Sequence, residues 1–410
     1  MRVIAILATC LLVACGSKAA PRAPESAGEP GSVMSGFDAG RLARIDGLVE
    51  ESIAARQLPG AVVLVGHGDR TVYAKAYGHR ALVPALEPMT FDTIFDIASL
   101  TKVVATTTSV MVLIEQGRIR LNDRVAAHIP GFERYGKQDV TVRHLLTHVS
   151  GLRPDFDLNV PFDGYARAIE LATEEVLEAP PGQRFVYSDI NFFLLGDIVA
   201  RVSGAPLDVF ARKHVFEPLG MKDTMFRPPD TLDARIAPTE PCERLAWPCQ
   251  TPGAPMLRGL VHDPTARRMG GVAGHAGLFS TAADLARFAR ALLRGGELDG
   301  VRVLAPLAVA RMIEPASPED LRQQRALGWD VDSSFSANRG ELLPVGSFGH
   351  TGFTGTSLWI DPATQVFVVF LSNRVHPDGK GDVTPLRARV ATAAAAAFIG
   401  APPLASLQQH

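Results

Sequence analysis

Stretches with strand character lie near both ends of this 410-residue chain, and a long helical interval separates them. Residues 61–67 and 71–77 are rich in β-branched and aromatic side chains, and Gly68-Asp69-Arg70 joins them. This pattern predicts a hairpin and therefore an antiparallel sheet. Strand character returns at residues 357–360 and 366–372. The order predicts an α+β fold in which a helical insertion splits a sheet domain.

Apolar residues at helical spacing predict helices before the first strands and after the last ones, at about 38–56 and 386–398. The interval 227–277 is rich in Pro and Gly and is expected to be irregular loop. Further helices are expected in the middle of the chain, at about 99–117, 165–178, 191–202, 206–215, 282–293 and 306–313. We therefore expect one domain over 37–400, with a sheet part at 37–98 and 300–400, a helical and loop part at 99–299, and a tail at 401–410.

The composition is that of a globular protein with a large core. Hydrophobic residues make up 47% of the chain and charged residues 20%, which excludes a disordered protein. Lys and Arg number 41 against 43 Asp and Glu, giving a net charge of −2. Without a basic surplus, nucleic acid is not expected as a partner.

The first residues have the pattern of an export signal. Arg2 precedes an apolar run that is too short to span a bilayer, so residues 1–15 are interpreted as a signal peptide. The run ends in Leu-Val-Ala-Cys, which resembles a bacterial lipobox and makes Cys15 the expected lipid anchor. An ordinary signal peptide that contains a cysteine is the alternative. Residues 16–36 are interpreted as a flexible tether. Because Gly16 rather than Asp follows the cysteine, we expect the outer membrane, facing the periplasm.

Ser99-Leu100-Thr101-Lys102 is the only Ser-x-x-Lys in the chain and opens a predicted helix. Residues at i and i+3 share a helix face, so the amine of Lys102 can reach the hydroxyl of Ser99. A buried amine would have a lowered pKa and could accept the hydroxyl proton. The helix N-terminus adds positive charge where an oxyanion would form. The alternative is a serine helix cap followed by a solvated lysine.

Two further elements follow in order. Tyr187-Ser188-Asp189 precedes an apolar helix, and His350-Thr351-Gly352 precedes the second strand pair. With Ser-x-x-Lys, they resemble the three signature elements of the serine β-lactamase and penicillin-binding-protein superfamily. The resemblance is to the branch that contains class C β-lactamases, D-alanyl-D-alanine carboxypeptidases and related esterases, and it covers about residues 37–398.

The resemblance assigns roles to matching residues. It implies that Ser99 is the nucleophile of an acyl-enzyme, that Lys102 is the nearby base, and that Tyr187 passes the proton to the leaving group. The backbone N–H groups of Ser99 and Phe353 would form the oxyanion hole. Gly352 would let the strand edge approach the substrate.

The motifs also depart from the family pattern around Thr351, which is expected among the substrate-binding residues. His350 stands where the family usually has Lys, and it offers less fixed positive charge for a substrate carboxylate. Asp189 stands where β-lactamases usually have Asn, and its charge would repel a carboxylate. Asn191, two residues later, is the candidate for supplying the missing amide.

A glycine-rich stretch narrows the resemblance. Residues 259–263 and 270–277 are similar to a segment of members assigned to cell-wall turnover, including N-acetylmuramoyl-L-alanine amidases and low-molecular-weight penicillin-binding proteins. We expect this loop to place His262, Asp263 and His275 near the cleft. The alternative is that these histidines only hydrogen-bond the backbone.

Cys242 and Cys249 enclose six residues, so a disulfide is expected in an exported protein. No Walker loop and no Gly-x-Gly-x-x-Gly occurs, and we expect neither a cofactor nor a metal. The leading hypothesis is an exported serine hydrolase that acts through an acyl-enzyme on peptidoglycan-derived amides. The alternatives are a carboxylesterase on small acyl esters, which His350 favours, and a binding protein that is acylated without turnover. The sequence predicts no oligomeric state.

Overall fold

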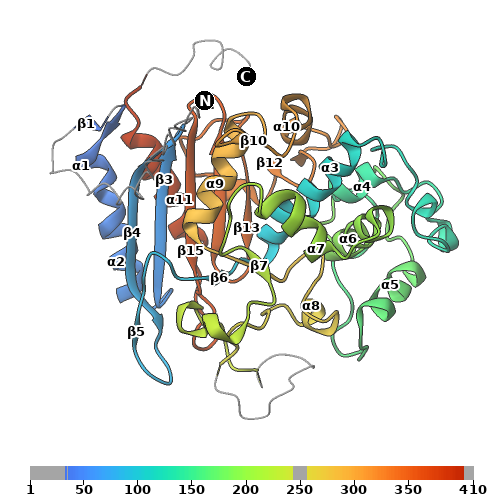
Figure 1. Cartoon of the computed structure of the whole chain (residues 1–410), viewed down its shortest axis with the longest axis horizontal. Helices are drawn as coiled ribbons and strands as arrows, with labels where there is room; N and C mark the ends of the chain where they lie inside the picture. Colours follow the sequence, from blue (N-terminus) through green and yellow to red (C-terminus); the bar gives the residue numbers. More distant parts are fainter. Residues whose placement is uncertain (1–32, 35, 243–255, 401–410) are drawn as a thin grey trace, which may run out of the picture.

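An eight-stranded antiparallel sheet dominates the computed structural model, which describes residues 33–34, 36–242 and 256–400 (Figure 1). Its strands run in the order β11-β12-β13-β14-β15-β3-β4-β5. Their bounds are β3 (Gly60–His67), β4 (Arg70–Ala81), β5 (Glu87–Pro88), β11 (Gln324–Arg325), β12 (Asp330–Asp332), β13 (Phe348–Gly352), β14 (Thr356–Asp361) and β15 (Val366–Ser372). Strands from both ends of the chain therefore pair directly, with Val63 opposite Phe370. The predicted α+β fold with a split sheet is confirmed.

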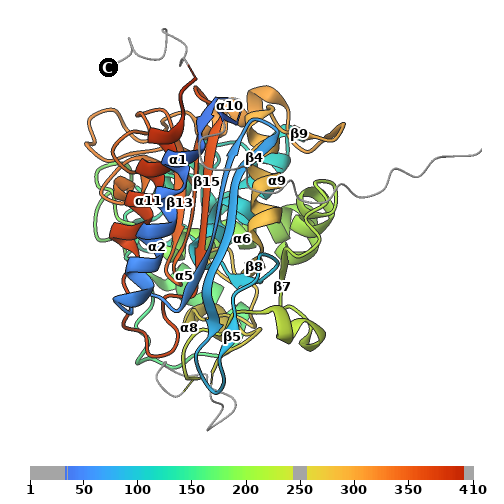
Figure 2. The ribbon, with the colours of Figure 1, turned by 90° about the vertical axis from the view of Figure 1, so that its left-hand side faces the viewer.

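Both faces of the central strands are buried, because helices cover each of them. Side chains alternate across a strand, so Val63 and Val65 pack on one face while Val62 and Leu64 pack on the other. The first face carries α1 (Ala39–Leu42), α2 (Arg44–Ala54) and α11 (Thr384–Ala397), and the second carries α9 (Ala282–Leu293) (Figure 2). This two-sided burial explains why β3 and β15 are almost continuously apolar.

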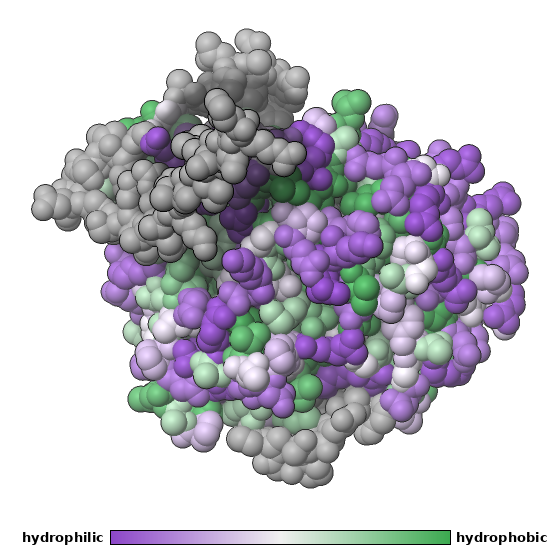
Figure 3. All heavy atoms as spheres, viewed as in Figure 1, coloured by the Kyte–Doolittle hydropathy of each residue, from purple (hydrophilic) through white to green (hydrophobic). Residues whose placement is uncertain are grey.

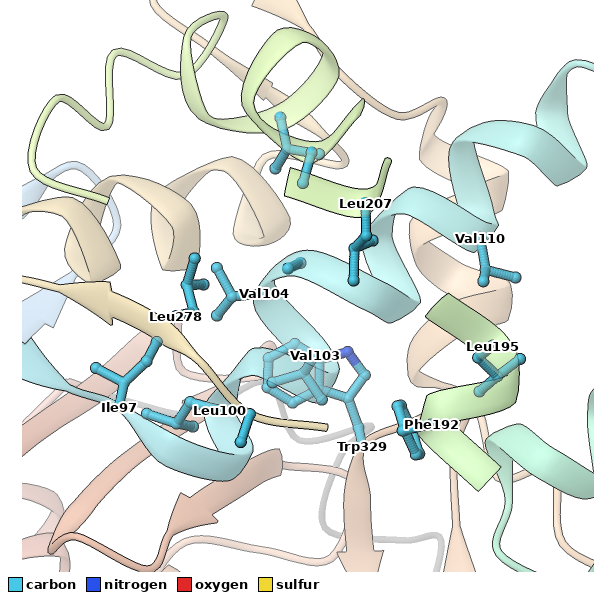
Figure 4. Close-up of a cluster of buried hydrophobic side chains, with 14 of the residues drawn as sticks. Ile97, Leu100, Val103, Val104, Val110, Phe192, Leu195, Leu207, Leu278 and Trp329 are labelled. Carbon is cyan, nitrogen blue, oxygen red and sulfur yellow. The ribbon is translucent and has the colours of Figure 1, made fainter. Parts of the chain in front are cut away.

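The helical region adjoins the second face of the sheet and shares its core. It contains α3 (Thr108–Glu115), α4 (Val142–Leu146), α5 (Tyr165–Glu174), α6 (Asp189–Ser203), α7 (Leu207–Ala211), α8 (Pro264–Arg268) and α10 (Pro306–Ile313). Figure 4 shows Val103 and Val110 packed among Phe192, Leu195 and Trp329, which come from different segments. In the view of Figure 3, hydrophilic residues cover most of the surface and apolar ones are scattered between them. One core therefore joins the insertion to the sheet.

The segment Ala98–Glu115 begins differently from the helix predicted at 99–117. A 3-10 turn spans Ala98–Leu100, a π-helical turn spans Lys102–Thr107, and α3 follows. π-Helical turns are rare and are often found at functional sites. By length and composition this segment could cross a membrane, but 83% of it is buried inside the fold. It is a core helix of the described fold.

Other expectations need correction or lie outside the described residues. His350-Thr351-Gly352 precedes the strand pair β14–β15 as expected, but it belongs to a further strand, β13, which was not predicted, and neither were β11 and β12. The expected loop at 227–277 contains a 3-10 helix at Asp230–Arg235 as well as α8. The expected signal peptide with Cys15, nearly all of the tether, Cys249 and the tail at 401–410 fall outside the residues that the structure describes.

Candidate active site

Ser99 lies on a strained turn that follows β6 (Phe95–Asp96). Its neighbour Ala98 has a φ of +46°, a left-handed conformation that costs a non-glycine residue free energy. The carboxylate of Asp96 accepts the Ala98 N–H at 2.8 Å, and Thr101 Oγ1 donates to the Ala98 carbonyl at 2.7 Å. These bonds hold the turn in a conformation that presents Ser99 at a cavity wall.

Lys102 lies behind Ser99 and is completely buried. Its Nζ donates to Ser99 Oγ at 2.9 Å and to the carbonyl of His275 at 3.1 Å. The same Nζ forms an ion pair with Asp189 Oδ1 at 2.6 Å. The Ser-x-x-Lys motif thus places its two side chains in contact. The glycine-rich loop supplies the His275 carbonyl, and the start of α6 supplies Asp189, as further partners of the Lys102 amine.

The charge of Lys102 differs from the sequence expectation. Burial lowers the pKa of Lys102, but the charge of Asp189, then Tyr187, outweighs it, so the pKa lies above the usual 10.5. The prediction of a lowered pKa was wrong, because the sequence did not reveal that Asp189 pairs with the amine. Lys102 is a cation at neutral pH and donates a hydrogen bond to Ser99, so it cannot accept the serine proton in this state.

Tyr187 immediately precedes α6 and packs between two aromatic rings. Its ring stacks on His148 with centroids 4.5 Å apart and lies 5.0 Å from Phe335. His148 Nδ1 accepts the Ser188 N–H at 3.1 Å, which fixes the ring tautomer. Burial, followed by the charges of Arg325 and Lys102, keeps the pKa of His148 well below 6.5. A neutral imidazole therefore supports Tyr187, a contact that sequence reasoning missed.

Asn191 does not lie beside the substrate cavity. Its Oδ1 accepts the Ser150 hydroxyl at 2.6 Å and its Nδ2 lies 3.3 Å from His148 Nδ1. Asn191 is fully buried and is absent from the cavity wall. The suggestion that it supplies a missing amide to substrate is therefore corrected: it positions the ring on which Tyr187 stacks.

His350 is buried within β13 and lines the cavity. Its Nδ1–H donates to the Thr351 carbonyl at 2.8 Å, so a neutral ring presents Nε2 as an acceptor. Burial is the main cause that holds the pKa of His350 well below 6.5, and the charges of Arg325 and Lys102 add to it. The imidazole is therefore neutral and provides no cation for a substrate carboxylate.

Gly352 brings β13 against the turn that carries Ser99. A Cβ at Gly352 would lie 2.4 Å from the Ile97 carbonyl and 2.1 Å from Thr356 Oγ1. Thr356 also donates to that carbonyl at 3.0 Å. The glycine thus permits close packing of strand and turn, whereas the expectation that it lets the strand edge approach the substrate stays a prediction.

Thr351 and Phe353, the neighbours of Gly352, both line the cavity. Phe353 is 62% exposed, and the Arg374 guanidinium lies 4.3 Å from the centroid of its ring. Arg374 Nε also donates to the Phe353 carbonyl at 2.9 Å. Ser99 and Phe353, whose N–H groups were predicted as the oxyanion hole, therefore line the same cavity.

The glycine-rich loop pairs its histidines with carboxylates rather than only with backbone. His262 Nε2 donates to Glu240 Oε1 at 2.7 Å, and its backbone N–H donates to Asp96 at 2.7 Å. His275 Nε2 donates to Asp263 Oδ1 at 2.9 Å. Burial opposes this pair, but its mutual attraction raises the pKa of His275 and lowers that of Asp263. His262 and Asp263 line the cavity, whereas His275 lies behind it.

A cavity of about 460 Å³ collects most of these side chains. The predicted residues that line it are Ser99, Tyr187, Asp189, His262, Asp263, His350, Thr351 and Phe353. Sequence reasoning missed other lining residues, namely Asp155, Leu158, Glu240, Arg325, Asp330 and Phe335. Burial, followed by the charges of Asp263 and Asp189, raises the pKa of Asp155 to about 7. None of the missed residues belongs to one of the three signature motifs, so no motif could have found them.

Within the described ranges, no group of three or more His, Cys, Asp or Glu side chains is arranged to hold a metal ion. Cys242 is disulfide-bonded.

The cavity is built from a serine, a lysine, a tyrosine and the histidine–carboxylate pairs, which is a set suited to nucleophilic acyl transfer.

Comparisons with known proteins match most of the chain. The family model described as "Beta-lactamase" matches residues 45–393. A protein of Salmonella schwarzengrund named "Putative D-alanyl-D-alanine carboxypeptidase" is 34% identical over 370 residues, covering 83% of this chain and 84% of the relative.

Solved structures share the fold. A penicillin-binding-protein homologue from Caulobacter crescentus has a TM-score of 0.69 at 24% identity, covering 87% of this chain and 97% of that one. EstCE1, described as a hydrolase with promiscuous acyltransferase activity, has a TM-score of 0.68 at 23% identity, covering 88% and 99%. From these matches and the Ser99–Lys102 contact, the chain belongs to the β-lactamase family of serine hydrolases.

Proposed function

We propose that this protein is an exported, lipid-anchored serine hydrolase that forms an acyl-enzyme at Ser99 on amides of peptidoglycan-derived peptides. The observation that carries the proposal is the contact of Ser99 Oγ with the buried Lys102 amine at the wall of a 460 Å³ cavity. The name of the Salmonella relative supports a peptide substrate.

The proposed reaction uses the protein's own side chains. Ser99 Oγ attacks the substrate carbonyl, and its proton moves to the oxygen of Tyr187, which takes part in the reaction as a phenolate. The Lys102 ammonium lies 5.0 Å from the Tyr187 ring centroid and favours negative charge there. Tyr187 then protonates the leaving nitrogen as the carbon–nitrogen bond breaks. In the second half, water attacks the acyl carbon and gives a proton to the Tyr187 oxygen, and Tyr187 returns this proton to Ser99 Oγ as the bond between Ser99 and the acyl carbon breaks.

A carboxylesterase acting on small acyl esters is the second candidate. The neutral ring of His350 favours it, because a cation for a substrate carboxylate is missing at that position. A binding protein that is acylated but not turned over is the third, since deacylation depends on how a water molecule is placed.

The test combines labelling with turnover. A fluorophosphonate should label the wild type but not Ser99→Ala, which should also lose turnover almost completely. Lys102→Ala and Tyr187→Phe should each lower kcat/KM for a p-nitrophenyl ester by at least about a hundredfold, the usual contribution of acid–base catalysis. Tyr135→Phe, at an exposed tyrosine, is the matched control and should behave as wild type.

The outcomes separate the candidates. Turnover of esters but not of muropeptides would favour the esterase, and labelling without turnover would favour the binding protein. Wild-type turnover by Ser99→Ala would refute the acyl-enzyme assignment.

The export proposal has its own test. Cys15→Ala should release the protein from the membrane fraction, because the lipid-bearing residue is lost. If the variant fractionates with membranes as before, the lipid anchor is refuted while the enzymatic proposal stands.

A further inference from the structure

Two buried polar side chains at one end of the cavity have atoms without a hydrogen-bond partner. His350 is 4% exposed and Arg325 is 1% exposed, and both line the cavity. Within the described part of the chain, His350 Nε2 and Arg325 Nε have no hydrogen-bond partner. A buried polar group without a partner costs free energy, and because both side chains line the cavity, a ligand bound there can supply the missing partners.

The two atoms without a hydrogen-bond partner need partners of opposite kinds, one a donor and the other an acceptor. His350 Nδ1–H is engaged with the Thr351 carbonyl, so Nε2 can only accept in the neutral ring. Arg325 Nε–H can only donate. Both side chains lie near Tyr187, with a ring separation of 6.1 Å for His350 and a guanidinium–ring separation of 5.9 Å for Arg325. A ligand group that satisfies both atoms needs a donor and an acceptor, and it would lie beside Tyr187, the proposed proton carrier.

This end of the cavity has no net charge. Arg325 Nη1 lies 3.4 Å from Asp330 Oδ1, and Arg325 Nη2 donates to the Gly328 carbonyl at 3.0 Å. Asp330 is itself buried and held by the hydroxyls of Ser333 and Ser336. The charge of Arg325 is thus offset before any ligand arrives.

The remainder of the cavity wall is acidic. Asp155, Asp189, Glu240 and Asp263 line it, whereas Arg325 is the one Lys or Arg among the described lining residues. Lys102 and His275 compensate Asp189 and Asp263 from behind the wall, whereas the partner of Glu240 is His262, a histidine that is charged only when protonated. A free carboxylate would therefore lose its hydration and meet like charges.

We propose that His350 and Arg325 form a leaving-group subsite for an uncharged carboxamide, as in the peptide bond that follows the scissile bond of a longer peptide, and that the cavity disfavours a free terminal carboxylate. The carboxamide N–H donates to His350 Nε2, and its carbonyl accepts from Arg325 Nε. This inference rests on the proposed acyl-enzyme at Ser99. It makes the protein an enzyme that cleaves within or at the start of a peptide rather than before its last residue.

The experiment uses two esters with the same acyl group, whose leaving groups are glycolamide and glycolate. They differ only in a neutral carboxamide against a carboxylate. Acylation is followed by release of the alcohol, so the comparison does not require deacylation. For the wild type we expect kcat/KM for the glycolamide ester to be at least about tenfold higher, the scale of one satisfied buried hydrogen bond. Equal rates, or preference for the glycolate ester, would overturn the proposal.

Variants assign the effect to the subsite. Asp330→Asn removes the negative charge that offsets Arg325. It should lower the ratio of kcat/KM for the glycolamide ester to that for the glycolate ester by about tenfold, because the glycolate ester reacts faster. Asp332→Asn is the control, because Asp332 is 53% exposed on the same strand and pairs with Arg339 instead. An unchanged preference in Asp330→Asn would refute the role of Arg325.

Two variants of His350 distinguish the loss of one hydrogen-bond acceptor from a general disturbance of the site. His350→Gln keeps an acceptor and should retain the preference, whereas His350→Leu should lose it. Loss in both variants would refute the acceptor role. A p-nitrophenyl ester serves as the reference substrate. If it acylates Ser99 while the glycolamide and glycolate esters react equally fast, only the proposed subsite is refuted. If no ester and no fluorophosphonate acylates Ser99, the proposed function fails as well.

Discussion

Asp189→Asn tests how the buried charge of Lys102 is maintained. Asp189 Oδ1 lies 2.6 Å from Lys102 Nζ, the lysine side chain is completely buried, and the aspartate side chain is 22% exposed. The substitution keeps the size and one oxygen but removes the negative charge. We expect a protein that still folds but has a lower free energy of unfolding, a lower pKa at Lys102 and a slower acylation step.

The magnitude follows from the distance. At 2.6 Å and an effective dielectric constant of about 20, two unit charges attract by about 6 kcal/mol. Partial exposure of Asp189 and proton loss from the unpaired amine both reduce the effect. Breaking a buried pair by removing one partner usually costs about 3–5 kcal/mol, so we expect a loss of about 3 kcal/mol in the free energy of unfolding at pH 7.

The loss should depend on pH in a defined direction. In the wild type the pKa of Lys102 is raised above its unfolded value of 10.5, so the pair stabilises the fold below that pH and ceases to do so as pH rises through the folded pKa. In Asp189→Asn, burial is no longer opposed by the largest favourable charge, that of Asp189, and we expect the folded pKa of Lys102 to fall below 10.5. The difference between the two proteins should therefore be largest at neutral pH and shrink towards pH 10.

Urea unfolding at pH 6, 8 and 10 measures this difference. Asp139→Asn is the control, because Asp139 pairs with Arg124 at 3.1 Å with both side chains more than 60% exposed. It should change stability by less than about 0.5 kcal/mol at every pH. A loss below about 1 kcal/mol at pH 7 in Asp189→Asn, or one that is the same at all three pH values, would refute the reasoning.

Three further predictions concern the cavity. Gly352→Ala places a Cβ 2.4 Å from the Ile97 carbonyl and should lower kcat about a hundredfold by displacing the Ser99 turn, whereas Gly47→Ala, with open space around it, should keep wild-type kcat. Because the pKa of His350 lies well below 6.5, its protonation should give no inflection near pH 6.5 in ester hydrolysis; an inflection there that His350→Gln removes would contradict this. Asp155, with a pKa of about 7, lines the cavity and should gain charge as pH rises from 6 to 8. KM for an ester that carries an ammonium group should therefore fall over that range, and a flat KM would contradict this prediction.

The fold was predictable where the sequence signal is local and long. The hairpin at β3 and β4 and the pair β14–β15 each carry a run of strand-forming residues, and their separation along the chain indicated the split sheet. The strands β11 and β12 contain two and three residues, which is too short for alternation to appear. β13 contains two glycines in five residues, which weakens its strand signal.

The site was predictable where a motif fixes residue types at a short spacing. Ser99 and Lys102 are three residues apart, and the structure places their side chains 2.9 Å apart. The charge of Lys102 depends on Asp189, which arrives from another helix, so no local pattern could give it. Arg325 and Asp155 lie in no motif, and only the folded chain brings them to the cavity.

The two departures from the family pattern both lower the positive electrostatic potential in the cavity. His350 replaces the usual lysine with a ring that burial keeps neutral, and Asp189 adds a carboxylate beside the nucleophile. Arg325 could have restored the missing cation, but Asp330 offsets it at 3.4 Å. Three separate positions thus reduce the positive potential that a carboxylate would need. Because each change alone would cost binding of a carboxylate substrate, their joint presence favours an uncharged group in the leaving-group end of the cavity.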